Sequence, residues 1–152
     1  MIINKYGMCF VSCTSDTPWP IDFLGKEREF DCFVVNTRDW LSEDHIRILA
    51  TKLARSSCSW VEVFGFGAEH IHDAIDSEAV NNGRQSKVGE GDPMTSWNDE
   101  RIEENELALY MLTGGQGYSQ WKLILVIGEK DVESRISTVI ETESSRLQSP
   151  AE

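Results

Sequence analysis

The fold is decided by residues 31–64, which read DCFVVNTRDWLSEDHIRILATKLARSSCSWVEVF. Two short apolar runs in this stretch predict strands at residues 31–36 and 59–64. Between them, Ser42 is suited to cap a helix over residues 43–55, whose apolar side chains recur at i, i+3, i+4, i+7 and i+8. A strand, a helix and a strand in this order are typical of a parallel sheet with helices packed on it.

The rest of the chain continues this alternation, with further strands expected at residues 6–13 and 120–127 and further helices at residues 68–80, 99–112 and 130–143. A polar loop rich in Gly and Asn occupies residues 81–98, and within it residues 94–97 have a strand-like pattern. We therefore predict a single α/β domain over residues 1–146. It has a mainly parallel, four-stranded sheet with helices on both faces, in a Rossmann-like or flavodoxin-like three-layer arrangement. A polar C-terminal tail is expected at residues 147–152.

Charge is the most informative feature of the composition. The 152 residues include 26 acidic and 14 basic side chains, a net charge of -12. Residues 62–106 alone carry 12 acidic and 3 basic side chains. Such a negative field disfavours nucleic acid and anionic membrane surfaces as partners, and it attracts a basic protein. The alternative is that the charge only keeps the protein in solution. With no apolar run long enough to span a membrane and no secretion signal, we expect a cytoplasmic protein.

The cysteines and histidines do not suggest a metal site. Four cysteines lie in the first 58 residues, in or beside predicted strands, and we interpret them as buried free thiols, namely Cys9, Cys13, Cys32 and Cys58. His70 and His72 are two positions apart on a predicted helix, so their side chains diverge. We expect no cofactor, no metal ion and no catalytic residue, and the sequence favours a binding protein over an enzyme.

Two glycine-rich turns resemble phosphate-binding motifs without completing them. Gly65-Phe66-Gly67 follows a strand and opens a helix, as a dinucleotide-binding turn does, but His70 stands where the third small residue belongs. Acidic side chains on the following helix also oppose a pyrophosphate, so we interpret this segment as a close turn that needs permissive glycines. Gly114-Gly115-Gln116-Gly117 lacks the Lys-Ser/Thr of a P-loop and is expected to end a helix.

The acidic segment of residues 99–106 is the candidate binding surface. On a helix, Glu100, Glu103 and Glu104 would share one face, beside an aromatic anchor. Such a face suits an Arg- or Lys-rich partner. The predicted partner-binding residues are Trp97, Asp99, Glu100, Glu103, Glu104 and Glu106. Two alternatives stay open, a solvated helix face and a carboxylate site for Mg²⁺ or acid–base catalysis.

Two segments resemble an uncharacterised bacterial α/β domain family. His72-Asp73-Ala74-Ile75-Asp76 corresponds to its W/H-D-x-x-D pattern. Met94-Thr95-Ser96-Trp97-Asn98-Asp99 corresponds to its Met-Thr-Thr-Trp-His-acid motif, with Asn98 in place of the histidine. The resemblance covers about residues 58–112. It implies a bacterial cytoplasmic protein with an α/β fold, and it implies no activity.

The leading hypothesis is an immunity or antitoxin-type inhibitor that docks a basic, nuclease-like toxin domain through its carboxylate-rich face. The alternative is a Rossmann-like enzyme with a divalent-metal or small-ligand site at the carboxyl ends of the strands. That site would lie near Asn36, Gly65, Gly67 and Gly128, with a metal held by Asp73, Asp76, Asp99 and Glu100. A third possibility is a structural subunit or a homo-oligomer, since the oligomeric state is left open.

Overall fold

The computed structural model describes residues 2–3, 7–14, 29–81, 94–98 and 103–148. These residues form strands and helices in the order β1 (Ile2–Ile3), β2 (Cys9–Thr14), β3 (Phe30–Asn36), α2 (Glu43–Arg55), β4 (Cys58–Gly65), α3 (Ala68–Asn81), β5 (Met94–Asn98), α4 (Glu104–Leu112), β6 (Trp121–Ile127) and α5 (Lys130–Gln148). The predicted α/β class is confirmed.

The sheet has the strand order β1-β2-β6-β3-β4-β5. The five strands from β2 to β5 in this order are all parallel, and only the two-residue β1 pairs antiparallel at the edge. The prediction of four strands was therefore wrong. The strand it left out is β5, which lies in the segment predicted as a loop and pairs with β4 from Trp60 opposite Met94 to Phe64 opposite Asn98.

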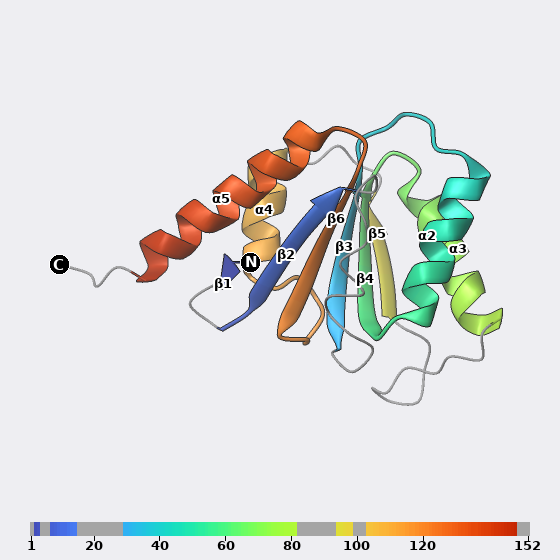
Figure 1. Ribbon diagram of the computed structural model, residues 1–152, viewed down its shortest axis with the longest axis horizontal. Helices are drawn as coiled ribbons and strands as arrows, with labels where there is room; N and C mark the ends of the chain where they lie inside the picture. Colours follow the sequence, from blue (N-terminus) through green and yellow to red (C-terminus); the bar gives the residue numbers. More distant parts are fainter. Residues whose placement is uncertain (1, 4–6, 15–28, 82–93, 99–102, 149–152) are drawn as a thin grey trace.

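Helices cover both faces of this sheet, as predicted (Figure 1). Helices α2 and α3 pack on one face, over alternate residues of β3, β4 and β6 such as Val34, Val63 and Leu125. Helices α4 and α5 pack on the other face, over the intervening residues such as Val35 and Val126. Strands β3, β4 and β6 therefore contribute to two apolar cores, which explains why they read as continuous apolar runs.

Helix α2 begins and ends where the sequence predicts. The Ser42 hydroxyl accepts a hydrogen bond from the His45 N–H at 3.1 Å, and the first turn carries Glu43 and Asp44. Lys52 and Arg55 occupy the last turn, where positive charge complements the helix dipole. The local signals and the packing of the apolar stripe therefore agree on the same boundaries.

The connections of β3 and β6 create a topological switch point. Strand β3 leads into α2 on one face, while its neighbour β6 leads into α5 on the other face (Figure 1). Neighbouring parallel strands whose helices depart to opposite faces leave a crevice beyond their carboxyl ends, and this is where α/β proteins bind ligands.

A buried polar network fixes the opposite, amino edge of the sheet. The Lys122 ammonium pairs with the Asp31 carboxylate, with only 1% and 2% of the two side chains exposed. The Ser119 N–H donates to Asp31 at 3.0 Å, and Lys122 donates to the Gly117 carbonyl at 3.0 Å. A Cβ at Gly117 would lie 2.4 Å from the Asp31 carboxylate, so the loop needs glycine there to close over the ion pair.

All four cysteines are free, and Cys9, Cys32 and Cys58 are buried as predicted, whereas Cys13 is only partly buried. Burial, with a contribution from Glu133, raises the pKa of the Cys13 thiol to about 12. Burial also raises the pKa of Cys32. These two thiols stay protonated at neutral pH and are poor nucleophiles. No helix in the described ranges is long and apolar enough to cross a membrane.

Candidate functional site

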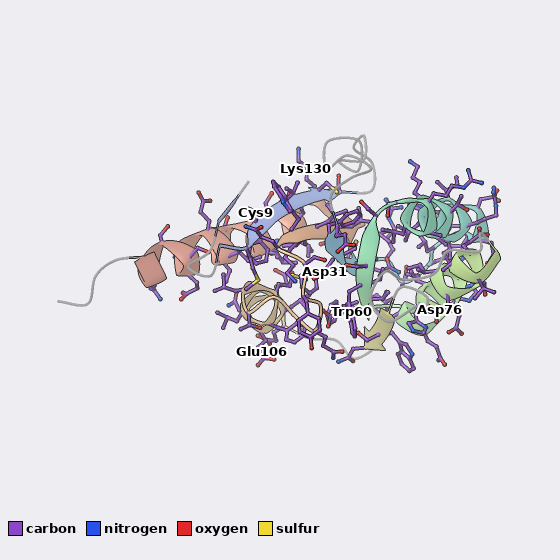
Figure 2. The ribbon with its side chains drawn as sticks, turned by 90° about the horizontal axis from the view of Figure 1, so that it is seen from below. Cys9, Asp31, Trp60, Asp76, Glu106 and Lys130 are labelled. Atoms are coloured by element: carbon purple, nitrogen blue, oxygen red, sulfur yellow. The ribbon has the colours of Figure 1, made fainter. Side chains whose placement is uncertain are left out.

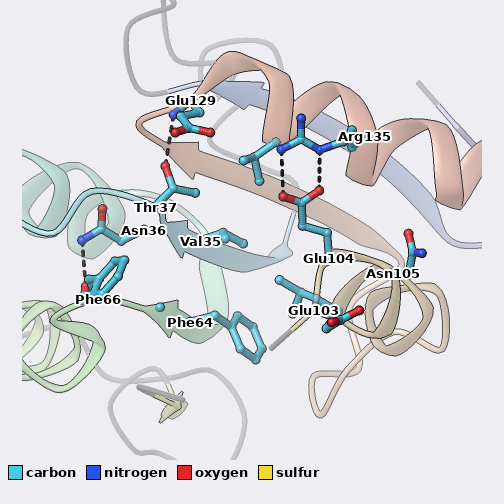
Figure 3. A pocket seen from close by; sticks show the side chains of 13 residues that line it. Val35, Asn36, Thr37, Phe64, Phe66, Glu103, Glu104, Asn105, Glu129 and Arg135 are labelled. Atoms are coloured by element: carbon cyan, nitrogen blue, oxygen red, sulfur yellow. Dashed lines mark hydrogen bonds and ion pairs between the residues drawn. The ribbon is translucent and has the colours of Figure 1, made fainter. Parts of the chain in front are cut away.

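A cavity of about 850 Å³ lies at the carboxyl edge of the sheet, on the side covered by α4 and α5 (Figure 3). The ends of β3 and β4 form one wall, and the first turns of α4 and α5 form the other. It lies at the switch point described above. Its lining consists of Val35, Asn36, Thr37, Phe64, Gly65, Phe66, Glu103, Glu104, Asn105, Leu107, Glu129, Val132 and Arg135.

Asn36 holds the strand ends of this cavity together. Its side-chain N–H donates to the Phe66 carbonyl at 2.7 Å, and its side-chain oxygen accepts from the Arg38 N–H at 3.1 Å. Its backbone carbonyl accepts from the Phe66 N–H at 3.3 Å. Gly65 has φ +95°, and a Cβ there would lie 2.1 Å from the Asn36 oxygen. The G-x-G segment is therefore a close turn against β3, which agrees with the sequence interpretation.

Thr37 fixes the turn between β6 and α5. Its hydroxyl donates to the Ile127 carbonyl at 2.9 Å and accepts from the Glu129 N–H at 3.1 Å (Figure 3). A Cβ at Gly128, which has φ +115°, would lie 2.2 Å from that hydroxyl. The backbone that carries Glu129 is thus held in place from β3, so this carboxylate projects from an ordered position on the cavity rim.

An ion pair joins α4 to α5 across the cavity. The Arg135 guanidinium donates to both oxygens of Glu104, at 2.5 Å from Nε and 2.9 Å from Nη2 (Figure 3). These hydrogen bonds raise the pKa of Arg135 above its ordinary value. A guanidinium held by two parallel hydrogen bonds has its strongest acceptor already in place. Two of the five N–H donors of Arg135 are therefore occupied by Glu104, and the carboxylate of Glu104 balances the charge of the guanidinium.

The cavity lining carries more negative than positive charge. Among the described residues, the lining holds three carboxylates, those of Glu103, Glu104 and Glu129, and one guanidinium, that of Arg135. Glu103 precedes α4 in extended backbone, and its side chain makes no capping hydrogen bond to the helix. Both Glu103 and Glu129 are exposed, whereas Glu104 is paired. The two exposed carboxylates are the groups that can receive a cation.

The predicted partner-binding residues divide among several places. Glu103 and Glu104 line the cavity. Glu106 is exposed and projects from α4 away from the sheet (Figure 2). Trp97 is 42% exposed on β5, and its register partner Val63 belongs to the core under α2 and α3, on the opposite face of the sheet from α4. Asp99 and Glu100 lie outside the described residues.

Glu103 and Glu104 do not share a helix face, contrary to the prediction. Helix α4 begins at Glu104, with Glu103 in an extended conformation before it. The prediction of a helix from residue 99 was therefore wrong for Glu103. The physical reason is that acidic side chains are favourable anywhere in the first turn of a helix. The run of acids at residues 99–106 therefore does not identify which residue is the N-cap.

The four proposed metal ligands do not form a site in the described part of the chain. Asp73 and Asp76 lie on α3, where they pair with His72 at 3.0 and 3.6 Å. Asp99 and Glu100 are not described. Among the described residues, no group of three or more His, Cys, Asp and Glu side chains could hold a metal ion.

Sequence reasoning missed Thr37, Glu129 and Arg135 as cavity residues. Their partners lie far away in the chain, since Thr37 contacts the turn 92 residues later and Arg135 pairs with Glu104 across 31 residues. The signal that could have found them is positional. Thr37 follows β3 and Glu129 follows β6 within two residues, and side chains at such positions gather at the carboxyl edge of a parallel sheet.

A family model described as "Domain of unknown function (DUF7684)" matches residues 8–143. This range covers nearly all of the strands and helices, and the chain belongs to this family. No curated protein and no solved structure matches the chain.

Proposed function

We propose that this member of the DUF7684 family is a binding protein for a basic protein partner, and that a Lys or Arg side chain of the partner enters the cavity at the carboxyl edge. The observation that carries this proposal is the charge of the described lining, in which Glu103 and Glu129 are exposed and the Arg135 guanidinium is paired with Glu104. A cation beside either of these carboxylates gains charge-assisted hydrogen bonds that an anion cannot make.

The whole-chain charge supports the same class of ligand. A net charge of -12 raises the local concentration of cations and speeds association with a basic surface. A phosphate group would be repelled, because it would have to approach Glu103 and Glu129 while Arg135 is paired with Glu104. Charge therefore favours a basic protein over a nucleotide or nucleic acid.

The narrower form of the proposal is an inhibitor of a basic, nuclease-like toxin domain in the bacterial cytoplasm. A nuclease binds the phosphates of its substrate with basic side chains, and carboxylates that occupy those side chains exclude the substrate. Charge complementarity is the support for this narrower form. This narrower form requires that the inhibitor cover the substrate-binding surface of its partner.

The test uses charge reversal with a matched control. The variant Glu103→Lys/Glu129→Lys reverses the two exposed cavity carboxylates. The control, Glu29→Lys/Glu141→Lys, makes the same change in net charge at two exposed positions away from the cavity. Glu141 lies about 18 Å along α5 from Glu129, at about 1.5 Å per residue, and Glu29 precedes β3 at the amino edge.

Wild type and both variants serve as baits for proteins from the native host, in parallel washes at about 50 and about 500 mM salt. We expect one basic protein that the wild type and the control retain at low salt and that the cavity variant loses. A basic protein bound equally by the cavity variant, or no basic protein bound by the wild type, would contradict the proposal.

A second candidate function is the binding of a small cationic molecule, as in an enzyme of the α/β class. The observation that favours it is the location of the cavity at the switch point between β3 and β6. A thermal-shift panel of agmatine, Mg²⁺, Mn²⁺ and nucleotides separates the two candidates. Stabilisation of the wild type by one of these compounds, absent in Glu103→Lys/Glu129→Lys, would favour the small ligand.

A further inference from the structure

A second, smaller hollow of about 190 Å³ adjoins the acid-lined cavity. The two share Asn36 and Phe66, so they are neighbours along the carboxyl edge of the sheet. Five apolar side chains line it, those of Trp40, Leu41, Ile46, Phe66 and Ile71, together with the charged side chains of Arg38 and Asp39. An apolar cavity of about 150 Å³ accommodates benzene, so this hollow has room for one large apolar side chain.

Two exposed aromatic side chains flank this hollow. Trp40 is 75% exposed and Phe66 is 53% exposed. A single exposed apolar side chain needs no explanation, but two aromatic rings at one hollow form a patch of the kind that binds a partner. Tryptophan is also among the residues that most often dominate the binding energy of an interface.

The backbone of Phe66 is held in a defined position before any partner arrives. Both the N–H and the C=O of Phe66 are hydrogen-bonded to Asn36. Trp40 lies two residues before Ser42, whose hydroxyl caps α2. Little conformational freedom of the backbone is therefore left to lose at Phe66 on binding, which favours affinity.

We propose that the two hollows together bind one segment of the basic partner, with its cationic side chain in the acid-lined cavity and a large apolar side chain against Trp40. This inference rests on the proposed function, because the acid-lined cavity selects a basic partner by charge complementarity. The smaller hollow adds a second requirement, a leucine-sized or larger apolar side chain near the cation. The docking surface is thus the carboxyl edge of the sheet, and not the outer face of α4.

The experiment pans a random 12-residue peptide library against the folded full-length protein. The baits are the wild type, Trp40→Ala, Glu103→Lys/Glu129→Lys and the control Tyr118→Ala. Tyr118 is 95% exposed in the loop before β6, at the amino edge, so its removal deletes an exposed aromatic ring elsewhere. Circular dichroism and melting temperature establish that each variant is folded.

We expect the wild type and Tyr118→Ala to enrich peptides that carry Lys or Arg close to Leu, Ile, Met, Phe or Trp. Trp40→Ala should keep the preference for Lys or Arg, lose the preference for the apolar residue, and bind the wild-type peptides about tenfold or more weakly. The double charge reversal should lose the preference for Lys and Arg.

Two contrary results are distinguishable. Enriched peptides that carry basic residues without an apolar neighbour, and bind Trp40→Ala as tightly as wild type, would overturn the two-hollow inference and leave the cationic cavity standing. Enriched peptides without basic residues, or no enrichment at all, would overturn the inference together with the proposed function.

Discussion

Replacement of Lys122 by methionine tests how much the buried network at the amino edge stabilises the fold. Its ammonium pairs with Asp31, with 1% and 2% of the two side chains exposed. Removal of one partner of such a pair costs about 3–5 kcal/mol, because the other charge stays buried. Asp31 keeps hydrogen bonds from the Ser119 N–H at 3.0 Å and the Ser59 hydroxyl at 3.1 Å. We therefore expect Lys122→Met to lose about 3 kcal/mol of stability, at the lower end of that range. Such a loss lowers the melting temperature by roughly 6–12 °C.

The assay is urea denaturation followed by circular dichroism and tryptophan fluorescence. The double variant Asp31→Asn/Lys122→Met removes both charges, so it should be less destabilised than the sum of the single variants by about 1–2 kcal/mol. Lys130→Met, at the exposed first residue of α5, is the control and should stay within about 0.5 kcal/mol of wild type. A loss below about 1 kcal/mol in Lys122→Met, or strict additivity in the double variant, would refute the reasoning.

Three further predictions concern other parts of the scaffold. Gly65→Ala should lower the free energy of unfolding by about 2 kcal/mol or more, because its Cβ would lie 2.1 Å from the Asn36 oxygen. A Cβ at Gly67 would meet nothing within 4 Å, so Gly67→Ala should lower it by less in the same denaturation assay. Ser42→Ala removes the cap of α2 and should lower the free energy of unfolding by about 1 kcal/mol. An unchanged denaturation midpoint would show that the cap is dispensable. Burial raises the pKa of Glu62 above 4.5, so the native state holds this proton to a higher pH than the unfolded chain does. The free energy of unfolding should then fall as pH rises from 4.5 through the native pKa, and Glu62→Gln should lack this component of the pH profile.

The parts of the fold that the sequence predicts well are those in which local and tertiary signals coincide. Helix α2 has a cap, charges matched to its dipole and one apolar stripe, so its boundaries follow from residues 42–55 alone. The central strands β3 and β6 are apolar on both faces, which only a doubly covered strand can bury.

The fifth parallel strand could not be predicted with the same strength. Strand β5 reads Met-Thr-Ser-Trp-Asn, with no apolar run and no clean alternation. Among the described strands it pairs with β4 alone, at the edge of the sheet, so few neighbours restrict which side chains it can carry. Backbone pairing, which any residue except proline can supply, determines its place in the sheet.

The candidate site was predictable in position but not in composition. The alternative enzyme hypothesis placed a site near Asn36, Gly65, Gly67 and Gly128, and of these Asn36 and Gly65 line the cavity. The acids of α4 were noticed for their density, yet only tertiary structure separates Glu103 and Glu104, which line the cavity, from Glu106, which does not. The pairing of Glu104 with Arg135 decides the charge of the site and depends on how α4 and α5 pack together.

The most direct test of the central claim is an amide NMR titration of the ¹⁵N-labelled full-length protein with N-acetyl-arginine amide, which carries one guanidinium and no other charge. The account predicts that the shift changes concentrate on Glu103, Asn105, Phe66 and Glu129, and that Glu103→Lys/Glu129→Lys abolishes them. Shift changes spread evenly over the acidic surface, or centred on residues outside the cavity, would contradict the claim that this cavity is the cation-binding site.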